Sequence, residues 1–290
     1  MMRRSGSSLM AARCAPAGVP TRPEPLPMPS PAPTQQRLSQ QERQAQILAL
    51  LRREGIVRIA DLAERFDVTT ETARRDLDEL AQSGAIKRTY GGGASRSLTE
   101  EPGIGVRSRA HAAERARIAT AAASLIEPGD ALMIDCGSTT ALFANALAAR
   151  NLPLTVVTNA LPVARTLATN ASCRVMLCPG EFALRENGVF GTDTLRYLGR
   201  FKANKAVIGA GGIAADAVTD ADSASCAVKR TMMERADRTQ LLVDSSKFDV
   251  VQFEEVCALE ALDELVCEAS PPRKLAARLK SASVQLVLAG

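Results

Sequence analysis

The chain has 290 residues, of which 46% are hydrophobic and 23% charged, and its net charge is +4. This apolar fraction is ample for a core in each of about two domains, so a fully disordered chain is excluded. No apolar run approaches the roughly 18 residues of a membrane span, and the mild charge gives no reason to expect general polyanion binding. We therefore expect a cytoplasmic protein with no membrane partner, in which nucleic-acid binding depends on where the charges lie.

The first 36 residues differ in composition from the rest of the chain. They hold eight of the fifteen prolines, and such a segment buries too little surface to offset its ordering entropy. We predict a disordered leader over residues 1–36. An upstream start codon that the native protein does not use would explain the segment equally well.

Seven cysteines are scattered along the chain without a Cys-x-x-Cys pair. Most of them have apolar neighbours, which favours reduced core residues over metal ligands or redox groups. The sequence therefore predicts no metal site and no cofactor.

Three helices are predicted in a domain that spans residues 37–94. Apolar residues at helical spacing lie between Ser39 and Glu54, and Gly55 follows at the usual place of a helix C-terminus. A short second helix covers residues 61–66, and a tight turn at Asp67 follows it. Beyond the turn, Thr69 is the predicted N-cap of a third helix.

The third helix has the pattern of a DNA recognition helix. Ala73, Leu77 and Leu80 fall at i, i+4 and i+7, so they face the core, and polar residues near the helix N-terminus face outward. A recognition helix offers these outward positions to the major groove. The candidates for DNA contact on this segment are Thr69, Thr70, Thr72, Arg74 and Arg75.

A short strand and a glycine turn follow the third helix at residues 86–93. This segment carries Lys87, Arg88 and Tyr90, which we expect to contact DNA. Two cations beside a glycine turn form a wing that can lie along a phosphate backbone. The three helices and the wing together predict a winged helix-turn-helix.

An ordinary helical subdomain is the alternative interpretation of this region. In that case Arg74 would pair with Asp78 and Arg75 with Glu79, at i,i+4 spacing. Such pairs contribute only about 0.2–0.5 kcal/mol each, and less when the cation precedes the acid. Helix pairing alone therefore gives little reason for this arrangement.

A second domain is predicted over residues 109–290, after a linker at residues 95–108. Short apolar runs alternate here with helical segments, which predicts a mostly parallel sheet covered by helices. The fold class is therefore α/β. The predicted strands are residues 131–135, 154–158, 174–177, 205–209, 240–244 and 262–267, and the predicted helices are residues 110–126, 140–149, 161–168 and 224–236.

Chemically distinctive residues follow four of the predicted strands, where ligands bind in sheets of this kind. A Gly-Ser-Thr-Thr turn that enters a helix suits a phosphate, an amide suits a sugar hydroxyl, and Lys247 is the expected charge partner. Each motif alone is more often a structural turn, but their convergence predicts a pocket for a phosphorylated sugar or polyol. The predicted effector contacts are Asp135, Gly137, Ser138, Thr139, Thr140, Asn159, Gly211, Gly212, Asp244 and Lys247.

These motifs resemble the DeoR family of bacterial transcriptional regulators over about residues 37–267. The specific pieces are the Thr-x-x-Thr-x-Arg-Arg-Asp-Leu segment from Thr69 to Leu77, the Tyr-Gly-Gly-Gly-Ala wing, and the segments that follow the strands. The resemblance implies a sensor domain similar in fold to ribose-phosphate isomerase. It also implies a repressor of a sugar or polyol catabolic operon, which binds double-stranded operator DNA as a homo-oligomer, a dimer or a tetramer.

An enzyme that uses the same pocket is the competing hypothesis, either a sugar-phosphate isomerase or a CoA-transferase-like protein. Isomerisation needs a base near a carbon-bound proton, and the candidates are Asp135, Glu181 and Asp244. The single histidine, His111, is interpreted as a surface residue. Because no candidate has an adjacent partner in the sequence, we expect no catalytic residues and favour the regulator.

Overall fold

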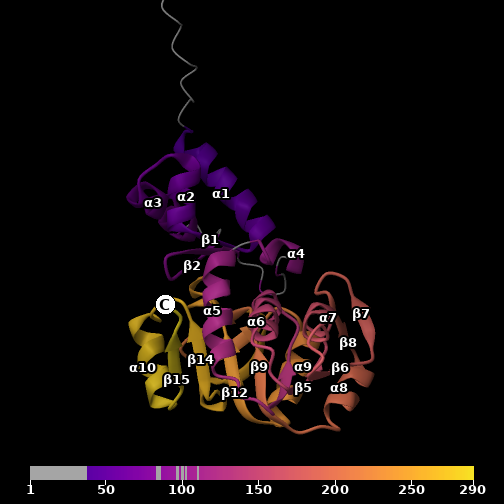
Figure 1. Cartoon of the computed structure of the whole chain (residues 1–290). Coiled ribbons are helices and arrows are strands. Elements are labelled where there is room, and N and C mark those ends of the chain that lie inside the picture. Colours follow the sequence, from indigo (N-terminus) through magenta and orange to yellow (C-terminus); the bar gives the residue numbers. More distant parts are fainter. Residues whose placement is uncertain (1–37, 83–85, 96–97, 99–100, 102, 110) are drawn as a thin grey trace, which may run out of the picture. The chain divides into compact units, whose positions relative to one another are not determined.

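The computed structural model describes residues 38–290, except for residues 83–85, 96–97, 99–100, 102 and 110 (Figure 1). The predicted leader at residues 1–36 lies outside the described residues. Within the described ranges, no helix is both long and apolar enough to cross a membrane.

Three helices and a three-stranded antiparallel sheet form the first part of the described chain. The strand order in this sheet is β1-β3-β2, so the wing pairs with a strand that precedes the second helix. The elements are α1 (Gln40–Glu54), β1 (Ile56–Arg58), α2 (Ile59–Phe66), α3 (Thr70–Gln82), β2 (Ile86–Thr89) and β3 (Gly92–Ser95).

Local sequence signals set the ends of these helices. Ser39 and Glu42 form a reciprocal capping box at the start of α1, and Gly55, with a φ of 77°, ends it. Asp67 takes a left-handed conformation in the turn after α2. The Thr69 hydroxyl accepts a hydrogen bond of 3.1 Å from the Thr72 amide, so the predicted N-cap is confirmed.

A glycine is required where β3 meets β1. A Cβ atom on Gly92 would lie 1.9 Å from the Val57 carbonyl oxygen, so no other residue fits there without moving a strand. Beneath this sheet the helices bury a continuous apolar cluster. Its largest fully buried members are Ile47, Leu51, Leu62 and Leu77.

A seven-stranded parallel sheet forms the centre of the second part, which confirms the predicted mostly parallel α/β fold. Its inner strands are mostly buried, as expected for a parallel sheet covered on both faces, whereas the two edge strands are partly exposed. In spatial order they are β15 (Gln285–Leu288), β14 (Glu264–Cys267), β12 (Ala236–Leu242), β9 (Ala203–Ile208), β4 (Ala131–Ile134), β5 (Leu154–Thr158) and β6 (Cys173–Leu177).

The order of these strands reverses between β4 and β9. From β4 the chain proceeds through β5 to β6 at one edge, and from β9 it proceeds through β12 and β14 to β15 at the other. Right-handed crossovers in opposite directions place helices on both faces. The helices are α4 (Ile104–Arg107), α5 (Ala112–Ser124), α6 (Ser138–Ala149), α7 (Leu161–Leu167), α8 (Thr192–Leu198), α9 (Ser223–Glu234) and α10 (Arg273–Ser281).

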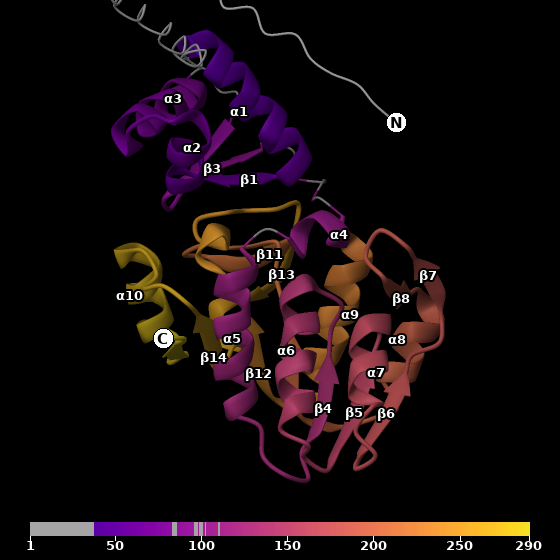
Figure 2. The ribbon, with the colours of Figure 1, turned by 45° about the horizontal axis from the view of Figure 1, so that its top comes forward.

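Figure 2 shows α5, α6 and α7 side by side over one face of the sheet, while α9 packs against the other face. The neighbouring strands β4 and β9 form a topological switch point, because the connections that follow them lead to opposite faces of the sheet. Ligands of open α/β sheets bind at such a point, beyond the carboxyl ends of the strands.

Several elements were not predicted from the sequence. Besides the strands β1, β3 and β15 and the helices α4, α8 and α10, they comprise a hairpin, a small antiparallel sheet and two short 3-10 helices. They are β7 (Glu181–Ala183), β8 (Gly188–Phe190), β10 (Gly212–Ile213), β11 (Ala217–Asp220), β13 (Glu254–Ala258), η1 (Ser245–Lys247) and η2 (Leu259–Ala261). The η1 turn directly follows β12 and carries Lys247.

Candidate nucleic-acid surface and anion cavity

A buried ion pair holds α3, the predicted recognition helix, against α1. Arg43 of α1 donates to both carboxylate oxygens of Asp76, at 2.7 and 3.1 Å, and Asp76 is almost completely buried. A bidentate pair of this kind adds geometric specificity as well as energy. Together with buried Ala73 and Leu77, it determines which face of α3 points outward.

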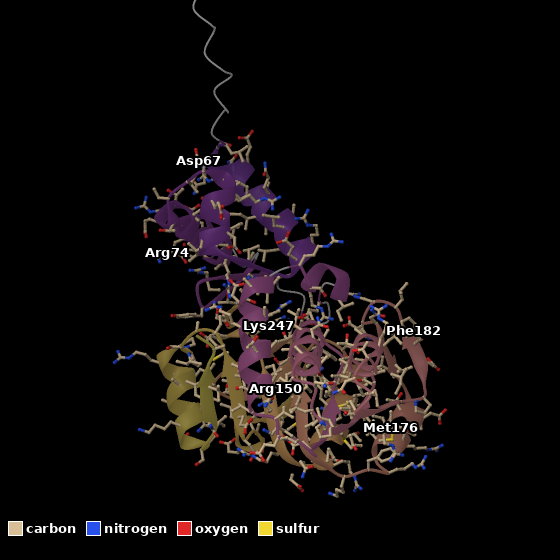
Figure 3. The ribbon with its side chains drawn as sticks, viewed as in Figure 1. Asp67, Arg74, Arg150, Met176, Phe182 and Lys247 are labelled. Carbon is tan, nitrogen blue, oxygen red and sulfur yellow. The ribbon has the colours of Figure 1, made fainter. Side chains whose placement is uncertain are left out.

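The outward face of α3 carries the side chains that were predicted to contact DNA. Thr69, Thr70, Arg74 and Arg75 are exposed and Thr72 is half-buried. Figure 3 shows Arg74 at the surface of this helix. The polar positions and the core positions of α3 therefore lie on opposite sides, as the periodicity predicts.

The ion pairs of the alternative interpretation are not formed. Arg74 pairs with Glu71 at 2.8 Å, whereas Asp78 pairs with Arg88 at 2.8 Å. Arg75 takes part in no ion pair with any residue that the structure describes, and its side chain is exposed. The guanidinium of Arg75 is thus available to an anionic partner.

The three wing residues differ in their exposure and in the contacts that they already make. Lys87 is exposed on β2, whereas Arg88 donates to the Gly92 carbonyl oxygen and pairs with Asp78. The side chain of Tyr90 is half exposed, and its ring centroid lies 6.4 Å from that of Phe248. Lys87 is therefore the wing cation that is most available to a phosphate backbone.

A cavity, here called the inner chamber, opens at the switch point where β4, β9 and β12 end. Cys136 to Thr139 enter it after β4, and Gly209 and Ala210 enter it after β9. Figure 3 shows Lys247 at this end of the sheet. The inner chamber is lined by Arg107, Arg115, Cys136, Gly137, Ser138, Thr139, Gly209, Ala210, Asp220, Lys229, Leu242, Val243, Asp244 and Lys247.

The N-terminus of α6 also faces the inner chamber. Its N-cap is Gly137, which has no side chain to accept hydrogen bonds from the first amides of the helix. Free amides and the positive end of a helix suit an anion. The Arg115 guanidinium, 2.9 Å from the Ser138 hydroxyl, adds positive charge beside this helix end.

Four cations line the inner chamber, and each has a carboxylate partner. Arg115 pairs with Asp244 at 2.7 Å. Lys229 lies between two carboxylates, 3.0 Å from Asp135 and 3.1 Å from Asp220. The other two, Arg107 and Lys247, share the carboxylate of Glu101, which belongs to the segment before α4.

A second cavity, here called the outer chamber, adjoins the first. It has a volume of about 240 Å³ and shares the lining residues Arg107, Cys136, Asp220 and Lys229 with the inner chamber. Its other lining residues are mostly polar: Glu101, Ala183, Arg185, Glu186, Ala221, Asp222 and Ser225. Together the two chambers offer a cationic end and a polar end.

The ionised forms of the chamber groups are stabilised by their partners. Burial opposes ionisation of Asp244, but Arg115 and Lys247 hold its pKa below the ordinary value. Burial also favours a neutral Lys229, but Asp135 and Asp220 raise its pKa above the ordinary value. Lys229 is therefore charged at neutral pH.

Five of the ten predicted effector residues line the inner chamber: Gly137, Ser138, Thr139, Asp244 and Lys247. The other five lie outside both chambers. Three of them use their polar groups in contacts within the fold, and two are glycines at places where the chain packs closely. These five are Asp135, Thr140, Asn159, Gly211 and Gly212.

The roles of these five residues are visible in their contacts. Asp135 is the buried counterion of Lys229, and the Thr140 hydroxyl donates to the Asp135 carbonyl oxygen at 3.0 Å. The Asn159 amide donates to the Val189 carbonyl oxygen at 3.1 Å. Gly211 and Gly212 pack closely against other segments of the same chain. A Cβ atom on Gly212 would lie 2.3 Å from the Val250 carbonyl oxygen.

Eight charged residues that line the chambers were not predicted from the sequence: Glu101, Arg107, Arg115, Arg185, Glu186, Asp220, Asp222 and Lys229. Arg115 lies on a helix and contacts Asp244, which is 129 positions away, so no local pattern connects the two. Only Asp220 could have been suspected from the sequence, because it ends a short buried strand just before Asp222, the N-cap of α9.

The residues of the enzyme hypothesis are arranged poorly for proton abstraction. Asp135 and Asp244 are engaged in ion pairs, and Glu181 is exposed on β7 outside both chambers. Burial raises the pKa of the Cys136 thiol to about 12, so this lining residue is no nucleophile at neutral pH. His111 is half-buried and precedes α5.

Arg58 connects the winged helix to the segment that carries Lys247. This residue ends β1, and its guanidinium donates to the Ser245 hydroxyl at 2.7 Å and to Glu268 and Glu114 at 3.0 and 2.9 Å. Ser245 is the first residue of η1 and Lys247 the last. One short turn thus touches both the inner chamber and the strand that leads into α2.

Two family models match the chain. A model described as the DeoR C terminal sensor domain matches residues 110–269, and one described as a DeoR-like helix-turn-helix domain matches residues 43–99. The first includes the strands around the switch point, and the second includes α2, α3 and the wing.

Curated relatives match almost the whole described chain. The glycerol-3-phosphate regulon repressor of Escherichia coli is 32% identical over 252 residues, which cover 87% of this chain and 100% of that protein. The transcriptional repressor CsqR of the same species is 30% identical over 247 residues, covering 85% and 94%. The L-fucose operon activator of Haemophilus influenzae is 28% identical over 245 residues, covering 83% and 97%.

Among solved structures, ribose 5-phosphate isomerase A of Methanocaldococcus jannaschii is similar with a TM-score of 0.35 and 17% identity. The match covers 48% of this chain and 55% of that protein. The beta subunit of eIF2B from Chaetomium thermophilum matches with a TM-score of 0.42 and 14% identity, covering 73% and 58%.

Proposed function

This chain belongs to the DeoR family of transcriptional regulators, and we propose that it represses a sugar or polyol catabolic operon under the control of a phosphorylated effector. The observation that carries this proposal is the inner chamber. Four cations and an uncapped helix N-terminus meet there at a topological switch point.

The effector is proposed to place its phosphate in the inner chamber and its hydroxyl-bearing part in the outer chamber. Lys247 and Arg107 supply charge for the phosphate, and the amides of Ser138 and Thr139 supply hydrogen-bond donors. The polar lining of the outer chamber suits hydroxyl groups. Glycerol 3-phosphate is the first candidate, because the name of a relative that is 32% identical refers to that compound.

Double-stranded operator DNA is the proposed partner of the winged helix. Arg74 and Arg75 of α3 are proposed to contact base edges in the major groove and Lys87 of the wing to contact phosphate, and the exposure of all three side chains supports this. A homo-oligomer, a dimer or a tetramer, is part of the proposal, because two recognition helices must match half-sites about 34 Å apart.

Coupling between the two sites is proposed to pass through η1. An effector that moves Lys247 also acts on Ser245, two residues earlier, and Ser245 is hydrogen-bonded to Arg58 of β1. A change in that contact alters the position of the winged helix and hence the spacing of paired recognition helices. A coupling free energy of about 1–3 kcal/mol is sufficient for regulation.

We propose that the chambers carry out no chemistry. The relatives named above are transcriptional regulators, and the carboxylates of Asp135 and Asp244 are used as counterions. Turnover of ribose 5-phosphate that is lost in Asp244→Asn would overturn this part of the proposal.

Calorimetric titration with glycerol 3-phosphate and other sugar phosphates tests the effector site. We expect saturable binding of at least one compound by the wild-type protein, and loss of that binding in Lys247→Ala. The matched control is Lys202→Ala, which removes an exposed lysine outside both chambers and should bind as the wild type does. A Lys247→Ala protein that binds and responds normally would show that the phosphate lies elsewhere.

A further inference from the structure

The carboxylates that pair with the chamber cations belong to different segments of the chain. Asp135, Asp220 and Asp244 stand at the ends of strands β4, β11 and β12, inside the folded sheet structure. Glu186 lies in the turn between β7 and β8. Glu101 instead belongs to the segment that joins the wing strand β3 to α4, so its carboxylate enters the chambers from the chain that leads out of the winged helix.

The Glu101 carboxylate also differs from the other carboxylates in its hydrogen-bond and ion-pair partners. Its carboxylate is hydrogen-bonded to the Lys247 ammonium and lies 3.3 Å from the Arg107 guanidinium. Asp244, by comparison, accepts a hydrogen bond from the Ser246 amide at 3.0 Å, and Asp135 accepts one from Gly209 at 3.3 Å. Among the residues that the structure describes, the Glu101 carboxylate thus contacts only cations, as an anionic ligand would.

The position of Glu101 separates the two chambers. Glu101 lines the outer chamber and its partner Lys247 lines the inner chamber, so the ion pair spans the passage between them. The inner chamber has a volume of about 30 Å³ in this state. Since one water molecule needs about 10–15 Å³ by this measure, the inner chamber is small.

We propose that Glu101 is a built-in competitor of the effector, a carboxylate that occupies the place of the effector's phosphate beside Lys247 and Arg107 until that phosphate displaces it. This inference rests on the proposed function and names how the same site is regulated. Because Glu101 precedes α4 and follows the wing, its displacement releases the linker at the same moment as the phosphate binds.

A competing internal anion reduces the apparent affinity to the intrinsic affinity multiplied by the fraction of molecules in which the site is free. If Glu101 is in place in about nine molecules out of ten, removing it tightens phosphate binding about tenfold. Inorganic phosphate and glycerol 3-phosphate should both gain, because the competition concerns the phosphate and not the rest of the ligand.

The test compares the wild type with Glu101→Gln by calorimetry, using inorganic phosphate and glycerol 3-phosphate as probes. The matched control is Glu260→Gln, which removes an exposed carboxylate that pairs with Arg278 and lines neither chamber. We expect Glu101→Gln to bind both probes about tenfold more tightly or better, and Glu260→Gln to stay within about threefold of the wild type.

A second measurement needs no variant. Hydrogen exchange of peptides that cover residues 98–107 should accelerate when saturating glycerol 3-phosphate is added to the wild-type protein. Equal or weaker phosphate binding by folded Glu101→Gln, or unchanged or slower exchange in this segment on binding, overturns the inference while leaving the effector site standing. If neither the wild type nor Glu101→Gln binds any phosphate compound, the proposed function fails together with it.

Discussion

The two ends of this protein use their charges in opposite ways. On α3 the side chain of Arg74 is 52% exposed, and Arg75 beside it is free of ion pairs with the described residues. In the inner chamber the side chain of Arg115 is 4% exposed, and each cation is already neutralised by a carboxylate. Exposed charges are ready for a polyanion at any time, whereas buried charges become available to a ligand only when an internal partner gives way.

The largest effect should follow from breaking a buried charge cluster. Lys229→Met leaves Asp135 and Asp220 buried without their shared cation, so we expect the free energy of unfolding to fall by about 3–5 kcal/mol. Urea denaturation measures this change. Lys202→Met, at an exposed position, should stay within about 0.5 kcal/mol of the wild type. Equal stability of both variants would show that the buried cluster is not needed for the fold.

The Glu101 ion pair should make stability depend on pH. Burial opposes ionisation of Glu101, but Lys247 and Arg107 outweigh it and lower its pKa from 4.5 to about 2. A lowered folded-state pKa gives a contribution that is complete above about pH 4.5 and is lost as the pH falls toward 2.

We therefore expect Glu101→Gln to be less stable than the wild type at pH 7, by about 1.5–3 kcal/mol. This difference should shrink as the pH is lowered from 4.5 to 3, and urea midpoints at several pH values measure it. A difference that is constant from pH 7 to 3 would contradict the pairing of Glu101 with these cations.

At the exposed end, loss of an arginine should weaken DNA binding without affecting the fold. Arg74→Ala or Arg75→Ala should reduce operator affinity by about 1–3 kcal/mol if the side chain reads a base. Their stability should stay within about 0.5 kcal/mol of the wild type. Arg174→Ala, at an exposed position on β6, is the control. Unchanged operator binding in both helix variants would refute the docking of α3.

The smallest effect should come from the wing. Lys87→Ala should lower the slope of log affinity against log salt concentration by about 0.9, with little change in sequence preference. Arg88 is already neutralised by Asp78 and bonded to Gly92, so Arg88→Ala should change the slope less. Fluorescence anisotropy at several salt concentrations measures both slopes. The opposite ranking would mean that the wing rearranges on DNA.

The sequence predicts the exposed end of the molecule better than the buried end, for a physical reason. Which residues of α3 face outward depends on a period of 3.6 residues, and the helix start depends on a cap such as Thr69, so both are local. Six strands of the large sheet were found in the same way, since each is a short apolar run. The edge strand β15 is half exposed and lacks that signal.

The chambers were predicted only in part, because their charges meet through the fold. The Gly137 to Thr139 turn and Lys247 follow strands, so the rule for parallel sheets locates them. Arg115 and Lys229 come from helices, and no sequence pattern pairs them with Asp244 or Asp135. Conversely, Asn159 has the polarity of a ligand contact, but its amide serves a neighbouring backbone carbonyl.

If a ligand in the inner chamber controls the DNA-binding surface, operator affinity must differ with and without that ligand, and this difference is the most direct measurement. A duplex from the promoters beside the gene and a random duplex are titrated with protein at physiological salt, each with and without saturating glycerol 3-phosphate or another phosphorylated sugar. We expect tighter binding to the promoter duplex than to the random one, and a change in operator affinity of about fivefold or more with one phosphorylated ligand. Equal affinity for both duplexes, unaffected by every ligand that binds the cavity, would contradict it.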